Sequence, residues 1–307
     1  MPKAILLFSG GLDSILAYKI LESQRINVVP ICFESYFFNC DQAQKSAGNN
    51  GFKIKTVDIS KAQLDIVKNP RYGRGKHLNP CIDCHLLMLQ EAKKIMKREK
   101  ADFLATGEVL GQRPFSQSGR VFNIAEKKSG MEEFIVRPLS AKLLPETNPE
   151  KRKLVKRDNF FDFQGKTRKG QLELAKKFNI RYFPQPAGGC LLTDCQFSKK
   201  LENLMEIKPA FTGEDISVLK KGRIFFEKDF FIAVARDQKE GWELAGLKKP
   251  KDLLAEPKNF AGPAVLVRFL GQKTKDKKEK ALRRAEELII KYSKKEKMPS
   301  NIEIRIL

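Results

Sequence analysis

Short apolar runs alternate with amphipathic segments along the first half of the chain. Apolar residues at helical spacing predict helices at 14–24, 41–49, 60–67 and 82–98. Apolar stretches long enough for one buried strand each lie between them, at 4–8, 28–33, 53–57 and 103–106. Strands that alternate with helices are typical of an α/β fold. We therefore expect a doubly wound parallel sheet with ligands at the carboxyl ends of its strands.

The pattern changes in the second half of the chain. Between 133 and 198 it predicts helices at 146–157 and 168–178 and an irregular loop that ends at Cys190. From about 209 it predicts strands at 222–226, 230–235 and 264–269, then a basic helix with one apolar face, made of Ala281, Leu282, Ala285, Leu288, Ile289 and Tyr292. No internal repeat is visible. We expect two domains, a catalytic α/β domain at 1–205 and a smaller α+β domain at 210–307.

The composition favours a polyanionic partner. The 307 residues include 59 Lys and Arg against 37 Asp and Glu, a net charge of +22, which suits RNA better than a small metabolite. Basic stretches at 151–157, 165–169 and 273–297 are candidates for phosphate contacts, although a charged helix is commonly just a solvated face. A thermophilic source would also raise the Lys and Glu content. No apolar run approaches the roughly 20 residues of a membrane span, and no signal peptide precedes the first strand. We expect a cytoplasmic protein without a membrane partner.

The first strand leads directly into Ser9-Gly10-Gly11-Leu12-Asp13-Ser14. A Ser-Gly-Gly turn before a helix lets backbone N–H groups surround an anion. Asp13 adds a carboxylate for Mg²⁺, and Ser14 adds a hydroxyl donor for a phosphate oxygen. No Gly-Lys-Ser/Thr follows, which excludes a Walker A loop. The alternative is an ordinary glycine-rich turn.

Other strand ends carry residues that could share a cleft with this turn. They are the 32–38 stretch, which includes Phe33, and Thr106-Gly107-Glu108. Because the carboxyl ends of parallel strands meet at one edge of a sheet, we expect these segments to lie together.

Six cysteines suggest metal or sulfur chemistry before structural disulfides. Cys81 and Cys84 lie at a predicted helix start, so their thiols project to one side, and the helix N-terminus would lower their pKa values. A lone CxxC pair is ambiguous between zinc, a redox pair, an iron–sulfur centre and chance. Cys190, after Gly188-Gly189, adds a third thiolate. Three thiolates on a four-iron cluster leave one iron open, whereas structural zinc takes four ligands, which Cys195 could complete. We interpret Cys32 as a buried thiol and Cys40 as a bystander beside a helix.

Five motifs together resemble the PP-loop tRNA 4-thiouridine synthetases. SGGLDS resembles their PP-loop, Thr106–Gln112 with Ser116-Gln117 resembles their TGExxGQ…SQ stretch, and Arg137-Pro138-Leu139 resembles their RPL. NPCIDCH at 79–85 and AGGCLLTD at 187–194 resemble the branch with a three-cysteine [4Fe-4S] cluster. The chain shows neither the THUMP nor the rhodanese domain of longer members. The 221–223 and 233–237 segments resemble an NFACT-type RNA-binding domain.

The resemblance implies an ATP-dependent tRNA sulfurtransferase that adenylates a uridine, U8 in this family, and replaces its C4 oxygen with sulfur. It implies ATP, Mg²⁺ and a [4Fe-4S] cluster held by Cys81, Cys84 and Cys190. Those cysteines and Asp13 would be catalytic. The nucleotide would contact Ser9, Gly10, Gly11, Asp13, Ser14, Phe33, Thr106, Gly107, Glu108, Gln112 and Ser116. Partners would be tRNA and sulfide or a sulfur-donor protein, and a homodimer is one option for the oligomeric state.

Two alternatives stay open. One is a tRNA 2-thiouridylase that uses Cys81 and Cys190 as a persulfide and disulfide pair. The other is a non-catalytic RNA-binding protein that uses ATP as a switch.

Overall fold

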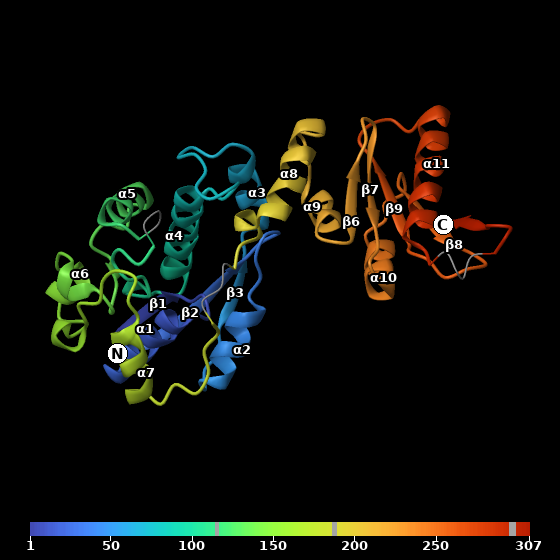
Figure 1. Cartoon of the computed structure of the whole chain (residues 1–307). Coiled ribbons are helices and arrows are strands. Elements are labelled where there is room, and N and C mark those ends of the chain that lie inside the picture. Colours follow the sequence, from blue (N-terminus) through green and yellow to red (C-terminus); the bar gives the residue numbers. More distant parts are fainter. Residues whose placement is uncertain (114–116, 186–188, 295–298) are drawn as a thin grey trace. The chain divides into compact units, whose positions relative to one another are not determined.

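The computed structural model describes residues 1–113, 117–185, 189–294 and 299–307. The chain divides into two compact units, Met1–Thr193 and Asp194–Leu307 (Figure 1). This boundary lies earlier in the chain than the expected one at 205–210. The helix α8 (Cys195–Ile207) belongs to the second unit because it contacts α9 (Gly213–Leu219) and the strand β6 (Arg223–Phe226).

The first unit is an α/β fold around a five-stranded parallel sheet of order β3-β2-β1-β4-β5, as predicted. Its strands are β1 (Lys3–Leu7), β2 (Asn27–Glu34), β3 (Lys55–Asp58), β4 (Phe103–Thr106) and β5 (Ile135–Val136). Its helices are α1 (Leu12–Ser23), α2 (Asp41–Asn49), α3 (Ser60–Lys68), α4 (Cys81–Arg98), α5 (Gly119–Ser129), α6 (Asn148–Lys151) and α7 (Lys169–Lys177). Short 3₁₀ turns lie at Ala141–Leu143, Arg157–Asn159 and Leu191–Thr193.

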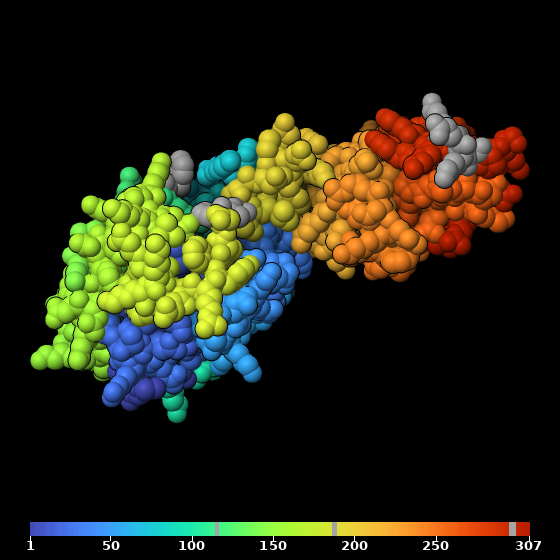
Figure 2. Space-filling view, turned by 60° about the horizontal axis from the view of Figure 1, so that its bottom comes forward, coloured from blue at the N-terminus to red at the C-terminus, as the bar shows by residue number. Residues whose placement is uncertain are grey.

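Helices cover both faces of this sheet, because successive side chains of each strand point to opposite faces. Ala4 and Leu6 of β1 pack in the core beneath α1, α2 and α7, whereas Ile5 packs in the core beneath α3, α4 and α5. The segment after α7 continues beside α1 and α2 (Figure 2), where the Asn50 Nδ2 donates to the Tyr182 carbonyl at 2.8 Å.

One expected helix is much shorter than its pattern suggests. The 146–157 segment forms only the single turn α6 and a later 3₁₀ turn. Lys153 follows α6 with φ +56°, in the left-handed region that ends an α-helix.

The second unit has an antiparallel sheet of order β10-β8-β9-β7-β6. Beyond β6 its strands are β7 (Phe230–Val234), β8 (Leu253–Pro257), β9 (Val265–Phe269) and β10 (Ile304–Ile306). The basic helix α11 (Lys275–Tyr292) buries Ala281, Ala285, Leu288 and Ile289 against one face, as its pattern predicted. The helix α10 (Gln238–Gly246) contacts β9 and places Leu244 in the interior.

Candidate active site

The Ser-Gly-Gly turn between β1 and α1 is built on the neighbouring helix α2. Gly10 has φ +79°, and a Cβ added there would lie 2.6 Å from the Ala43 Cα. The Ser46 hydroxyl donates to the Gly10 carbonyl at 2.8 Å, and the Ser14 hydroxyl donates to the Gly11 carbonyl at 2.8 Å. Gly11 is the N-cap of α1 and has no side chain to occupy the first helical amides. The turn is therefore rigid, and it presents a helix N-terminus that suits an anion.

The end of β4 lies directly against this turn. A Cβ on Gly107 would be 2.6 Å from both the Asp13 carbonyl carbon and the Ser14 nitrogen. In the sheet, β1 is followed by β2 on one side, and β4 is followed by β5 on the other side. The chain therefore leaves these two adjacent strands in opposite directions, and doubly wound folds bind their ligands at such a point. The structure thus brings together the Ser9–Ser14 and Thr106–Glu108 segments.

Asp13 occupies the centre of this region. Burial raises the pKa of its carboxyl group, and Arg168, a hydrogen bond with Gln112, and Arg113 partly oppose that rise. The buried Asp13 Oδ1 and Arg168 Nε have no hydrogen-bond partner within the described part of the chain. A carboxylate oxygen and a guanidinium N–H left without partners within electrostatic reach of each other fit a bound metal–phosphate group. Gln112 was expected here, whereas Arg113 was missed and Arg168 was noted only as part of a basic stretch.

Glu108 is engaged by protein groups. Its carboxylate pairs with the Arg137 Nε at 3.1 Å and the His85 Nδ1 at 3.3 Å, and it accepts from the Thr106 hydroxyl at 3.0 Å. Burial works against ionisation, but Arg137, His85 and Thr106 outweigh it and lower the pKa of Glu108 to about 2. The carboxylate thus fastens β4 to α4 and to Arg137.

Arg137, the first residue of the RPL motif, directly follows β5. Its side chain is 4% exposed and also pairs with the Glu126 Oε1 at 2.5 Å. Its guanidinium lies 3.8 Å from the centroid of the Phe122 ring. Arg137 therefore joins β4, α5 and the loop after β5 beside the candidate site.

Replacing Arg137 with methionine should lower the free energy of unfolding by about 3 kcal/mol, because it removes the guanidinium that neutralises the largely buried carboxylate of Glu108 and leaves only His85 and Thr106 beside it. Urea unfolding at pH 7 measures this loss. A double variant, Arg137→Met with Glu108→Gln, should recover part of it, because the stranded charge is then absent. A double variant no more stable than Arg137→Met alone would contradict the explanation.

The same network predicts a pH dependence with a definite sign. The pKa of Glu108 is about 2 in the folded protein and about 4.3 when unfolded, so its ionised form stabilises the fold. That contribution is complete above about pH 5 and is lost as the pH falls through 4 towards 2. The difference in stability between wild type and Arg137→Met should shrink over the same interval.

The three cysteines of the motifs lie in one region. Burial raises the pKa of Cys84 to about 12, and Cys190 and Cys81 add to the rise. Burial raises the pKa of Cys190 to about 11, and Cys81 again adds to it. Thiols influence one another in this way only when they are near neighbours. The expectation that the helix N-terminus would lower the pKa of Cys81 and Cys84 was wrong, because burial outweighs the helix dipole.

Backbone hydrogen bonds hold the Cys190 segment against the rest of the unit. The Leu191 N–H donates to the Phe37 carbonyl at 3.0 Å, and the Leu78 N–H donates to the Leu192 carbonyl at 3.2 Å. The first bond ties the segment to the loop after β2, the second to the loop before α4. Gly188 of the AGGC motif and Ser116 lie outside the described residues.

The described residues offer no preformed site for a single metal ion. Within the described ranges, no group of three or more His, Cys, Asp or Glu side chains is placed to hold one. Cys195, the fourth ligand of the zinc alternative, is exposed at the first position of α8. The four-iron cluster therefore stays a prediction from the cysteine motifs.

Cys32 and Cys40 form a disulfide, which corrects their interpretation as a free thiol and a bystander. Cys32 belongs to β2, and Cys40 is the N-cap of α2. The bond closes the loop that accepts the Leu191 hydrogen bond, with both half-cystines buried. No spacing rule for metal or redox pairs covers a separation of eight residues, so the sequence offered no signal for it.

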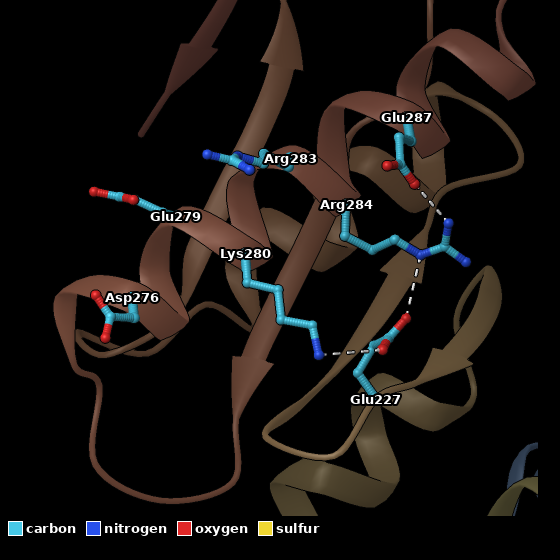
Figure 3. A pocket seen from close by; sticks show the side chains of 7 residues that line it. All are labelled: Glu227, Asp276, Glu279, Lys280, Arg283, Arg284 and Glu287. Atoms are coloured by element: carbon cyan, nitrogen blue, oxygen red, sulfur yellow. Dashed lines mark hydrogen bonds and ion pairs between the residues drawn. The ribbon is translucent and has the colours of Figure 1, made fainter.

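A groove of about 470 Å³ lies in the second unit, between α11 and Glu227 (Figure 3). Its lining combines both signs of charge. Arg284 pairs with Glu227 at 3.3 Å and with Glu287 at 2.7 Å, and Lys280 contacts Glu227 at 3.8 Å. These basic groups of α11 are neutralised locally, so the groove does not suit a polyanion.

No helix in the described parts of the chain is both long and apolar enough to cross a membrane.

The family match found among known proteins lies within the first unit. Residues 1–142 match the family described as thiamine biosynthesis protein (ThiI). A probable tRNA sulfurtransferase of Alkaliphilus oremlandii is 27% identical over 148 residues, 45% of this chain and 36% of the relative. A tRNA-specific 2-thiouridylase MnmA of Karelsulcia muelleri is 26% identical over 131 residues, 39% of this chain and 34% of the relative. The matched region thus spans about a third of each curated relative.

Two solved structures show distant likeness. One is a 4-thiouridine synthetase in complex with RNA and ATP, with a TM-score of 0.35 and 18% identity over 71% of this chain and 52% of the other. The second is a predicted tRNA methyltransferase subunit of Methanocaldococcus jannaschii, with a TM-score of 0.35 and 18% identity over 58% and 76% of the two chains. Likeness this distant leaves the function of this chain open.

Proposed function

We propose that this protein is an ATP-dependent tRNA sulfurtransferase that converts a uridine, U8 in the family it resembles, to 4-thiouridine. One observation carries the proposal. The anion-binding turn and Cys81 are within electrostatic reach of one residue, because Arg113 influences the pKa of both Asp13 and Cys81, and Cys81 in turn influences the pKa of Cys84 and Cys190. A nucleotide activated at the turn therefore lies beside the sulfur chemistry. The matches to the ThiI family and to a tRNA sulfurtransferase support this proposal.

The chemistry assigns distinct tasks to the residues of the turn. The uridine O4 attacks the α-phosphorus of ATP and pyrophosphate leaves, which turns the oxygen into a good leaving group. The Gly10–Gly11 turn and the N-terminus of α1 bind the departing pyrophosphate. Arg113 and Arg168 add positive charge, and Asp13 would hold Mg²⁺, which would neutralise phosphate charge. Sulfide then adds at C4 and AMP leaves.

Cys81, Cys84 and Cys190 are the proposed ligands of a [4Fe-4S] cluster that would present sulfide to the activated base. Burial raises the pKa of Cys84 and Cys190 and so favours their neutral thiols, and binding of a cluster would therefore release protons. Gln63 donates to the Cys84 sulfur at 3.3 Å and helps to orient it.

The second unit is proposed to bind the tRNA. Its antiparallel sheet with a basic helix and the chain's net charge of +22 are the features of an RNA-binding module.

A 2-thiouridylase is the second candidate. The similarity to MnmA and the proximity of Cys81 to Cys190 favour it, because a persulfide on one thiol needs a resolving partner.

Anaerobically purified protein, incubated with unmodified tRNA, ATP and sulfide, should produce 4-thiouridine and release one pyrophosphate per thiolated base. Mass spectrometry of digested tRNA with authentic standards identifies the product. A 2-thio product would establish the second candidate. ATP binding without pyrophosphate release would instead indicate a nucleotide-switched RNA-binding protein.

A further inference from the structure

The outer face of α10 exposes the only tryptophan of the chain. Trp242 is 69% exposed, more than any other large hydrophobic residue in the described ranges except Met1 at the terminus. The opposite side of the helix is packed, with Leu244 buried and Gly241 close to Ala264. An indole held outward on a packed helix is an aromatic platform without a protein partner within the described chain.

The surroundings of the indole leave its ring accessible. At helical spacing, the neighbours of Trp242 on the outer face are Gln238, Lys239, Ala245 and Gly246, all of them exposed. A Cβ on Gly246 would meet nothing within 4 Å, so this side of the platform is open. Lys239 is exposed and supplies positive charge next to the ring.

A lysine cluster lies just beyond the C-terminus of α10. Arg268, at the end of β9, donates to the Leu247 carbonyl at 2.7 Å, which brings the segment after β9 next to Lys248. Burial and the charges of Lys278 and Lys248 lower the pKa of Lys273, so these three ammonium groups are neighbours. Lys248 follows Trp242 by six residues and lies two residues beyond the end of α10, so the two Cα atoms are at most about 20 Å apart, within the span of a few nucleotides.

The cluster differs from the other basic groups of the second unit in its pairing. Lys277 pairs with Asp229 at 2.8 Å, and Lys280 and Arg284 contact Glu227. Among the described residues, Lys239, Lys248, Lys273 and Lys278 form no ion pair. Their charge is therefore available to an external anion.

We propose that this surface binds single-stranded RNA, with one nucleobase stacked on Trp242 and the adjoining phosphates on Lys248, Lys273 and Lys278. The inference rests on RNA as the substrate class proposed above and locates its contact in the second unit. An aromatic platform flanked by unpaired cations matches the chemistry of an unpaired nucleotide, whose base is apolar on its faces and whose phosphate is anionic. A duplex keeps its bases stacked inside and offers no face to the indole.

The single tryptophan makes the test direct. The intrinsic fluorescence of the full chain should be quenched saturably by a single-stranded 12-nucleotide oligouridylate, and much less by a 12-base-pair RNA duplex. Fluorescence anisotropy of labelled oligouridylate should show binding about tenfold weaker for Trp242→Ala and within about threefold of wild type for Trp242→Phe. The triple variant K248Q/K273Q/K278Q should flatten the salt dependence of binding by about 0.7 in slope for each lost contact.

Lys258→Gln is the matched control, because Lys258 is an exposed lysine of the same unit already paired with Glu303 at 2.7 Å. It should leave affinity and slope unchanged. Tryptophan fluorescence that stays unquenched at saturating concentrations of the oligouridylate, or wild-type affinity of Trp242→Ala for it, would overturn the inference. If the wild type thiolates tRNA in either case, the proposed function stands without this surface. Quenching by a protein that never thiolates tRNA would leave the surface standing and remove the proposed function.

Discussion

Alanine at Cys81, Cys84 or Cys190 should abolish both the visible absorption of an iron–sulfur cluster and tRNA thiolation. Each of the three thiolates would hold a different iron, so the loss of any one leaves the cluster with too few protein ligands. The expected fall in thiolation is to the background rate. Iron and sulfide content, the spectrum of anaerobically purified protein and the yield of 4-thiouridine measure the effect together.

Cys195→Ala is the control for these variants, because Cys195 is a free but exposed thiol in the second unit. It should retain cluster and activity. Stoichiometric zinc in anaerobic protein, lost in Cys195→Ala, would replace the cluster with a structural zinc site. Activity in the absence of iron, lost with Cys81 or Cys190 but not with Cys84, would support the persulfide mechanism instead.

Asp13→Asn should slow pyrophosphate release by at least about 100-fold and leave tRNA affinity nearly unchanged. The substitution keeps the shape of the side chain but removes the charge that would hold Mg²⁺ beside the departing pyrophosphate. The buried Oδ1, without a partner in the described residues, marks this group as the one prepared for a ligand. Pyrophosphate assays and tRNA binding by anisotropy separate the two effects.

Asp41→Asn is the matched substitution, because Asp41 is an exposed carboxylate in the first turn of the neighbouring helix α2. It should release pyrophosphate at the wild-type rate. A near-normal rate in Asp13→Asn would show that the nucleotide binds elsewhere, whereas an equal loss in both variants would point to damage of the turn as a whole.

The fold of the first unit was predictable because its helices and strands carry strong periodic patterns. The four expected strands correspond to β1 to β4 of the structure. The parallel sheet that their alternation with helices predicted is confirmed. The two-residue strand β5 was expected only as a strand exit at Arg137-Pro138-Leu139, since a strand so short has no measurable period, and the helix α5 was missed. In the second unit, α10 and β8 were missed because tertiary packing, rather than local pattern, decides such short elements.

The candidate site also has a part that the sequence predicted and a part that it did not. The turn and the three cysteines were predicted, because they belong to short motifs whose residues lie close together in the chain. Arg113 and Arg168 approach Asp13 from segments far apart in the chain, and no spacing rule connects them. The engagement of Glu108 with Arg137 and His85 is also a product of tertiary structure, as is the Cys32–Cys40 bond.

The central position of β1 has a consequence for folding during synthesis. One edge of β1 pairs with β2, which follows soon after it, but the other edge waits for β4 at Phe103–Thr106. The core around α1 also waits for α7 at Lys169–Lys177, so the first unit closes only when nearly all of it has left the ribosome. In the second unit, β6 pairs with β7 and β8 with β9 across short connections. Loop closure is therefore cheaper there, and the slow, aggregation-exposed step of biogenesis lies in the unit made first.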